Sequence, residues 1–149
     1  MRPTPALILS VLLLGACANP VPPTTPAGAA ISTAQLLNTY WKLTQLGDLV
    51  ITTPQDAREM HFVMHAENQR VTGFSGCNQM MGAYVLDGSE LRFEQMGGTM
   101  MACVSNMDLE RRFLDMFGQV AGWEIQGESL KLLDANHEPL ADFESRYMN

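Results

Sequence analysis

Runs of alternating apolar and polar residues, separated by turn residues, constrain the fold of this 149-residue chain more than any other feature. In Tyr40–Leu46, Trp41 and Leu43 fall on one face and Lys42 and Thr44 on the other. This is the period of a half-buried strand. Comparable short runs, several of them joined by turn signals such as Asp-Gly, predict further strands at 49–51, 60–66, 70–74, 82–86, 90–93, 123–126, 129–133 and 140–144.

One segment, 105–120, changes to the period of a helix. Its apolar residues form a single stripe made of Leu109, Phe113, Met116, Phe117 and Val120. Strands and helices do not alternate along the chain, which disfavours a parallel sheet. The sequence therefore predicts the α+β class, with a single antiparallel curved sheet of about eight short strands and one helix packed against it.

Residues 1–16 have the composition of an export signal. Arg2 precedes an apolar run, Ala6–Leu14, which at roughly ten residues is too short to cross a bilayer as a helix. The motif Leu14–Cys17 resembles the lipobox of bacterial lipoproteins, in which the cysteine is lipidated and becomes the first residue of the mature chain. The alternative is an ordinary secretory signal with an incidental cysteine. We expect lipidation at Cys17.

The segment that follows Cys17 has the composition of a tether. Four prolines lie among Thr, Ala and Gly within Asn19–Ala30. Such a segment buries too little apolar area to fold and stays extended. The sequence thus predicts three parts, which are a signal peptide at 1–16, a lipidated cysteine with a tether at 17–33, and a folded domain at 34–149.

The charge of the chain restricts its partners. The formal net charge is −7, and no basic cluster exists beyond Arg111 and Arg112, so binding to nucleic acid is disfavoured. The acidic domain is also not expected to dock electrostatically on anionic lipid. We expect the N-terminal lipid to hold the protein at the cell envelope. In a Gram-negative cell, Ala18 resembles the pattern that sorts lipoproteins to the outer membrane, facing the periplasm.

Two cysteines remain besides Cys17. Outside the cytoplasm, a pair such as Cys77 and Cys103 usually forms a disulfide, although a pair of buried free thiols is the alternative. A third reading, Cys77 as a nucleophile with His61, His65 or His137 as its base, needs a thiolate that stays free.

Catalytic signatures are weak elsewhere in the sequence. Gly73–Cys77 is similar to the nucleophile elbow of serine hydrolases, Gly-x-Ser-x-Gly, but Cys77 replaces the last glycine. The sequence also does not predict a parallel strand, a turn and a helix at this position. The acidic residues do not single out a catalytic pair. We therefore expect no enzyme and no cofactor.

Methionine is unusually frequent, with eleven residues. Thioethers bind Cu(I), and exported copper proteins use clusters of them. The alternative function is therefore a periplasmic Cu(I)-binding protein with Met100, Met101 and Met107 as ligands, although methionine more often fills irregular gaps in a core. The cluster comprises Met80, Met81, Met96, Met100, Met101 and Met107.

Several short motifs together resemble one family. Gly73–Asn78 (GFSGCN) and Thr99–Cys103 (TMMAC), followed by a helix that carries Glu110, are similar to the hallmarks of the META domain family. This family includes the heat-shock protein HslJ and related small exported lipoproteins. The similarity extends over roughly Thr39–Phe143, and its other matching segments are Tyr40–Leu43, Gly82–Tyr84, Asp87–Gly88, Leu91–Phe93, Leu130–Leu132 and Pro139–Leu140.

The resemblance implies a role for each hallmark residue and a context for the protein. It implies a single antiparallel α+β domain, a stress or envelope setting linked to heat response and antibiotic tolerance, and no established catalytic residue. Gly73 and Gly76 would permit sharp bends or close backbone approach, and Asn78 and Thr99 would stabilise two loops that a Cys77–Cys103 disulfide joins. The expected function is a non-catalytic, lipid-anchored module that binds an envelope protein or a small apolar ligand, or has a structural role, under stress. The hallmark residues are Gly73, Gly76, Asn78, Thr99 and Glu110.

Overall fold

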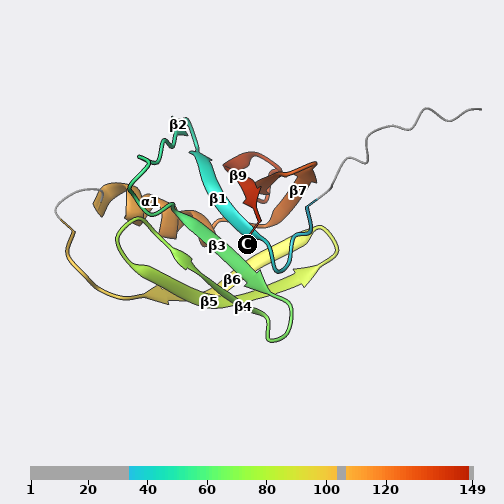
Figure 1. The fold of residues 1–149 in the computed structure, drawn as a ribbon. Helices are drawn as coiled ribbons and strands as arrows, with labels where there is room; N and C mark the ends of the chain where they lie inside the picture. Colours follow the sequence, from blue (N-terminus) through green and yellow to red (C-terminus); the bar gives the residue numbers. More distant parts are fainter. Residues whose placement is uncertain (1–33, 104–106, 148–149) are drawn as a thin grey trace, which may run out of the picture. The chain divides into compact units, whose positions relative to one another are not determined.

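A computed structural model describes residues 34–103 and 107–147, which contain nine strands and one helix (Figure 1). The expected signal peptide, the lipidated Cys17 and the tether lie outside the described residues. The strands are β1 (Tyr40–Leu46), β2 (Leu49–Val50), β3 (His61–His65), β4 (Arg70–Phe74), β5 (Gln79–Asp87), β6 (Glu90–Gly98), β7 (Gly122–Gln126), β8 (Ser129–Leu133) and β9 (Pro139–Arg146), and the helix is α1 (Met107–Phe117).

The strands form one antiparallel sheet with the order β2-β1-β3-β4-β5-β6-β7-β8-β9. β1 also pairs with β9, from Tyr40↔Arg146 to Leu46↔Ala141, and this pairing closes the sheet on itself. The predicted class, a single antiparallel curved sheet with one helix, is confirmed. The closure is a further feature, because it pairs strands from opposite ends of the domain.

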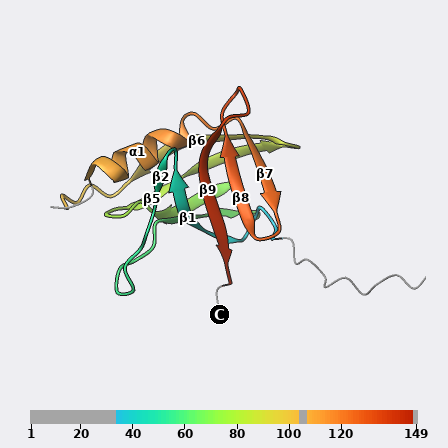
Figure 2. The ribbon, with the colours of Figure 1, turned by 90° about the horizontal axis from the view of Figure 1, so that it is seen from above.

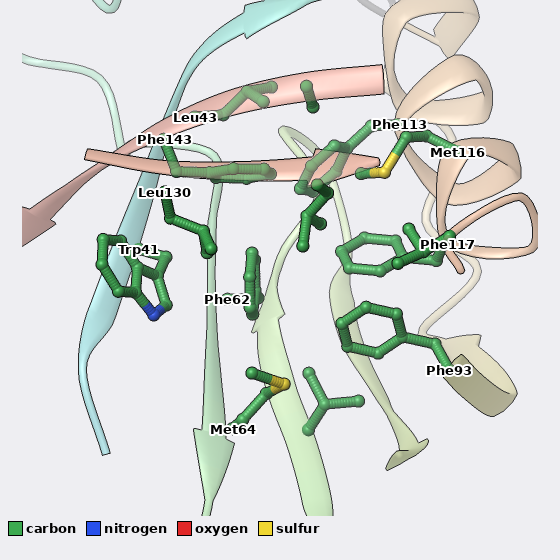
Figure 3. Close-up of a cluster of buried hydrophobic side chains, with 14 of the residues drawn as sticks. Trp41, Leu43, Phe62, Met64, Phe93, Phe113, Met116, Phe117, Leu130 and Phe143 are labelled. Carbon is green, nitrogen blue, oxygen red and sulfur yellow. The ribbon is translucent and has the colours of Figure 1, made fainter. Parts of the chain in front are cut away.

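Aromatic side chains fill the interior of the sheet. Phe62 on β3 makes edge-to-face ring contacts with Phe93, Phe117 and Phe143, at centroid distances of 5.9, 5.6 and 4.9 Å (Figure 3). Trp41 is fully buried in the same cluster, and its indole N–H donates to a backbone carbonyl 3.0 Å away. Pairs of aromatic rings in these geometries add about 0.5–1.5 kcal/mol beyond the area they bury.

Helix α1 packs its apolar stripe on this cluster. Its buried residues Phe113, Met116 and Phe117 point into the core, and Phe117 meets Phe93 edge to face at 4.8 Å (Figure 3). The helix lies on the β6 side of the sheet (Figure 2). It ends at Phe117 rather than at residue 120, because Gly118 follows, and Val120 packs into the core from the loop beyond.

β5 and β6 extend well beyond the predicted 82–86 and 90–93. β6 contains a bulge, where Gln95 takes a positive φ of 52° and the pairing shifts from Ala83↔Glu94 to Met81↔Gly97. After the bulge the strand carries Gly97 and Gly98, so it lacks the apolar–polar alternation from which strands are predicted. The extension places the ends of β5 and β6 beside α1.

α1 has 11 residues and is the one helix in the described part of the chain. A helix that spans a membrane needs about 20 largely apolar residues. No helix in residues 34–103 and 107–147 reaches that length.

Candidate functional site

The first part of the site is the tight loop that joins β4 to β5. The N–H of Ser75 donates to the carbonyl of Asn78 at 2.9 Å, and Gly76 takes a φ of 104°, a conformation that L side chains rarely adopt. Just before this loop, β4 approaches β3 so closely that a Cβ on Gly73 would lie 2.2 Å from the carbonyl oxygen of His61. A side chain at Gly76 would therefore be strained, and one at Gly73 would clash with the backbone of β3.

The second part is the carboxylate of Glu110, which α1 places against this loop. Glu110 is only 6% exposed although it is ionisable. Its Oε1 accepts hydrogen bonds from the Ser75 hydroxyl and from the Asn78 backbone N–H at 3.0 Å, and its Oε2 accepts from Asn78 Nδ2 at 3.2 Å. A buried carboxylate needs such donors to offset the loss of hydration. Glu110 thus fixes the helix to the β4–β5 loop.

The third part is the segment 99–102, which the side chain of Asn78 holds in place. Asn78 Oδ1 accepts from the Thr99 hydroxyl at 2.7 Å and from the Met101 N–H at 2.8 Å, and Nδ2 lies 3.2 Å from the Met101 carbonyl. Thr99 Oγ1 in turn accepts from the Gln79 N–H at 3.1 Å. We call Ser75, Asn78, Thr99 and Glu110 the polar junction, because they tie two loops and the helix together.

A disulfide lies next to the polar junction. The structure pairs Cys77 with Cys103, with 6.0 Å between their Cα atoms, within the range that this bond requires. The bridge joins the β4–β5 loop to the segment that follows β6. The same two pieces of chain are therefore held together both covalently and by the side chain of Asn78.

Replacing both cysteines, Cys77→Ser with Cys103→Ser, is expected to lower the free energy of unfolding by about 2–4 kcal/mol, because the bridge restricts the unfolded chain. Urea unfolding of the variant and of the oxidised wild type measures this loss. Reduced wild type should match the double variant. If dithiothreitol leaves the urea midpoint of the wild type unchanged, the expected bridge makes no contribution.

A pocket of about 760 Å³ opens beside the polar junction. Its apolar lining comes from the ends of β5 and β6, from the segment after β6, and from α1. Met100, Met101 and Met107 are 98%, 57% and 51% exposed, so these thioethers face solvent at the pocket. We call this cavity the methionine pocket. Its apolar side chains are Met80, Met96, Met100, Met101, Ala102, Met107 and Leu114.

The structure brings most of the residues singled out in the sequence to one place. Asn78 forms hydrogen bonds with both Thr99 and Glu110. The three candidate copper ligands line the adjacent pocket. Ser75 lies within both the family motif GFSGCN and the incomplete hydrolase motif, but neither motif predicts its hydrogen bond to Glu110. The contribution of Leu114 was missed as well, because it lies beside the predicted apolar stripe of the helix.

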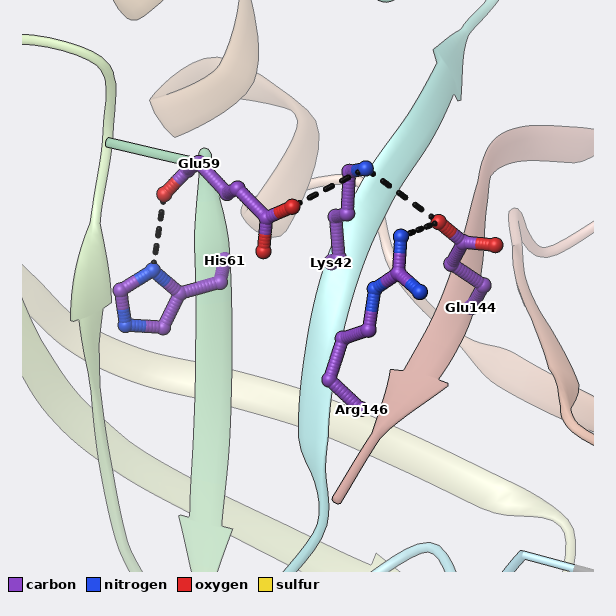
Figure 4. A network of polar contacts seen from close by, with 5 residues as sticks. All are labelled: Lys42, Glu59, His61, Glu144 and Arg146. Carbon is purple, nitrogen blue, oxygen red and sulfur yellow. Dashed lines mark hydrogen bonds and ion pairs between the residues drawn. The ribbon is translucent and has the colours of Figure 1, made fainter. Parts of the chain in front are cut away.

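His61 lies in a separate polar network on the outer face of β1, β3 and β9 (Figure 4). His61 Nδ1 lies 2.9 Å from the carbonyl of Glu59, and its ring stacks on Tyr40 at 4.1 Å. Burial lowers the pKa of His61 from its usual value, outweighing the opposing effect of the bond to Glu59. In the same network Lys42 bridges Glu59 and Glu144, at 3.0 and 3.3 Å, and Arg146 also pairs with Glu144.

Acidification is expected to destabilise the protein partly through His61. The pKa of His61 is lower in the folded chain than the value of 6.5 expected when unfolded, so below that pH the unfolded chain binds the proton more readily. Stability should therefore fall as the pH drops below about 6.5. Melting temperatures measured at about pH 7.5 and pH 5 test this. His61→Phe retains an aromatic ring that can stack on Tyr40, and its melting temperature should fall less on acidification than that of the wild type. Equal falls in melting temperature for the two proteins would contradict this role of His61. His137→Gln, which replaces an exposed histidine, serves as the control.

No group of three or more His, Cys, Asp or Glu side chains in the described residues is arranged to hold a metal ion.

The closed antiparallel sheet, the single helix and the polar junction define a small α+β domain with one structural hallmark cluster. The META domain profile matches residues 34–147, so the chain belongs to the META domain family. This confirms the resemblance seen in the hallmark motifs.

Two solved structures share the fold. An NMR structure of a protein from Burkholderia xenovorans is 24% identical with a TM-score of 0.60, covering 87% of this chain and 100% of that chain. A second NMR structure is 19% identical with a TM-score of 0.58, covering 73% of this chain and 90% of that one. No curated protein matches the sequence.

Proposed function

We propose that this protein is a non-catalytic binding module of the bacterial cell envelope, anchored by a lipid on Cys17 and acting under stress, and that its methionine pocket takes an apolar segment of another envelope protein. The observation that carries the proposal is the pocket itself, about 760 Å³ in volume, whose apolar lining is mostly methionine. Pockets that take ligands usually have volumes of about 300–1,000 Å³. Methionine, which is flexible and polarisable, is frequent at surfaces that adapt to varied apolar partners.

The polar groups beside the pocket support binding over catalysis. The oxygens of Glu110 already accept hydrogen bonds from Ser75 and Asn78, and Asn78 is engaged on both its oxygen and its nitrogen. A general base or nucleophile would have to give up these bonds in order to act on a substrate. Measurable turnover of ester, peptide or glycan substrates that Glu110→Gln abolishes would overturn this part of the proposal.

Binding in the pocket is tested with a neutral dye whose fluorescence rises in apolar surroundings, N-phenyl-1-naphthylamine. The double variant Met100→Gln with Met101→Gln should weaken dye binding by about tenfold or more. The matched control is Met81→Gln, because Met81 is 46% exposed but does not line the pocket. Equal binding by all three proteins, or an absence of saturable binding, would contradict the proposal.

The anchor is tested separately in cells. The wild type should incorporate radiolabelled palmitate and accumulate as an unprocessed form when globomycin blocks lipoprotein signal peptidase. Cys17→Ser should take up no label. Labelling of Cys17→Ser, or normal processing in the presence of globomycin, would contradict a lipid on Cys17.

One observation favours a second candidate function, Cu(I) binding. Met100, Met101 and Met107, the residues expected as ligands, line the same pocket, together with Met96. Titration with Cu(I) against a competing chelator decides between the two. A dissociation constant for Cu(I) of about 1 μM or weaker would contradict this second function. Replacing the three methionines with leucine should abolish Cu(I) binding but retain dye binding, since leucine keeps the apolar volume and lacks the thioether.

A further inference from the structure

The outer edge of β6 is unpaired next to the methionine pocket. β6 pairs with β5 from Asp87↔Glu90 to Met80↔Gly98, but with β7 only at Glu90↔Gly122. Within residues 34–103 and 107–147, no strand pairs with this edge between Arg92 and Gly98. An open edge offers backbone N–H and C=O groups to an added strand.

This edge forms one wall of a groove whose other wall is α1. The pocket is lined on one side by Met96, Gly97 and Gly98 of β6, and on the other by residues of α1 that include Arg111 and Leu114. The two glycines carry no side chains that would cover the edge. A Cβ placed on Gly97 would meet nothing within 4 Å, so the face of the strand toward which a side chain at this position would point is open.

The charges of the helix wall indicate the kind of partner. Arg111 pairs with Asp108 at 2.8 Å, whereas no ion pair of Asp115 is found in the described residues. The wall therefore carries an unneutralised carboxylate beside an apolar pocket, on a chain of net charge −7. A cationic segment complements this wall. A second copy of the chain would instead place the same acidic groups against one another.

We propose that the groove between β6 and α1 binds an extended, apolar and basic segment of another protein, which pairs with β6 as an additional strand. The inference rests on the proposed function and specifies how the partner is held. Main-chain hydrogen bonds to the 92–98 edge would supply affinity. Alternate side chains of the added strand would enter the methionine pocket, and a basic residue would lie near Asp115.

The test uses the full chain carrying Cys17→Ser, so that no lipid competes for the pocket, and a display library of random peptides of about eight residues. Selected peptides should alternate apolar and other residues, contain lysine or arginine, and displace the dye. Methylation of backbone nitrogens is then scanned along one selected peptide. Methylation at every second residue, where the N–H faces β6, should weaken binding by about tenfold or more, and methylation between them should have little effect.

Two further readouts locate the bound peptide on the protein. Amide hydrogen exchange within Arg92–Gly98 should slow when the peptide is present. Gly97→Val, which has open space for its side chain in the free protein, should fold normally and lose peptide affinity by about tenfold. Met81→Gln is again the control, and it should bind the peptide as the wild type does.

The outcomes separate the inference from the proposed function. Peptides that displace the dye but tolerate methylation at every position, with unchanged exchange in β6, would overturn strand addition while pocket binding stands. Failure to select any peptide while the dye still binds also overturns strand addition. Absence of both dye and peptide binding overturns the proposed function as well. A dimer of the free protein that Gly97→Val disrupts would assign the edge to a second copy and contradict the inference.

Discussion

Glu110→Ala is expected to lower the free energy of unfolding by about 3 kcal/mol, because it removes the acceptor of three hydrogen bonds. The carboxylate accepts the backbone N–H and the side-chain amide of Asn78 and the hydroxyl of Ser75, all in a site that is nearly closed to water. Without it, the Asn78 N–H in particular keeps its burial and loses its acceptor. Hydrogen bonds to charged groups contribute about 1.5–3 kcal/mol each, but the Ser75 hydroxyl can turn to the Asn78 carbonyl and recover part of the loss.

Two comparison variants separate this effect from a general effect on the helix. Glu110→Gln retains one acceptor oxygen and should lose only about 1 kcal/mol. Asp115→Ala removes an exposed carboxylate from the same helix and should change stability by less than about 0.5 kcal/mol. Urea unfolding of all three variants measures these differences. A loss in Glu110→Ala no larger than that in Asp115→Ala would show that the buried carboxylate contributes little to the fold.

Phe62→Ala is expected to produce the other large effect, a loss of about 3–5 kcal/mol. Phe62 is fully buried and meets three rings that come from β6, α1 and β9. Its removal leaves a cavity where three parts of the fold converge, and the surrounding strands cannot close it without breaking their pairing. Thermal and urea unfolding measure the loss.

Phe74→Ala is the matched control for this prediction, because Phe74 is only partly buried and lies on β4, the strand paired with β3. It stacks under Arg58 at 4.5 Å, a contact worth about 0.5–1 kcal/mol at a partly exposed site. Its loss should be well below that of Phe62→Ala. Similar losses in the two variants would contradict the central position that we assign to Phe62.

The sequence predicts strands well where apolar and polar residues alternate between turn residues. β1, β4 and β8 begin and end at the predicted residues, because each such run ends at a turn. The second half of β6 was missed, since Gln95, Gly97 and Gly98 carry no alternation and a bulge shifts the register. The closure of the sheet was missed for another reason, because the pairing of β1 with β9 joins segments that are distant in sequence and leaves no local pattern.

For the candidate site, the sequence predicted individual residues but not how they are connected. The family resemblance identified Asn78, Thr99 and Glu110, but it could not show that Asn78 connects the other two. The methionine pocket could not be foreseen from spacing alone. Met80, Met96 and Met107 come together only because β5 pairs with the end of β6 and the chain then turns back into α1. The sequence shows them as members of a methionine-rich stretch, but their spacing does not show that they line one pocket.

The polar junction and the methionine pocket are physically connected. Met101 takes part in both, since its backbone bonds to Asn78 and its side chain lines the pocket. The junction therefore fixes one wall of the proposed binding site.

The central claim is that the hallmark residues act together as one structural unit, and a double-mutant cycle between Asn78→Ala and Glu110→Ala tests it most directly. Unfolding free energies of the wild type, the two single variants and the double variant are measured in urea with the disulfide intact. We predict a coupling energy of about 1–3 kcal/mol, because each residue loses its main partner when the other is removed. Losses that add to within about 0.5 kcal/mol would contradict the claim, because they would mean that the two side chains stabilise the fold independently.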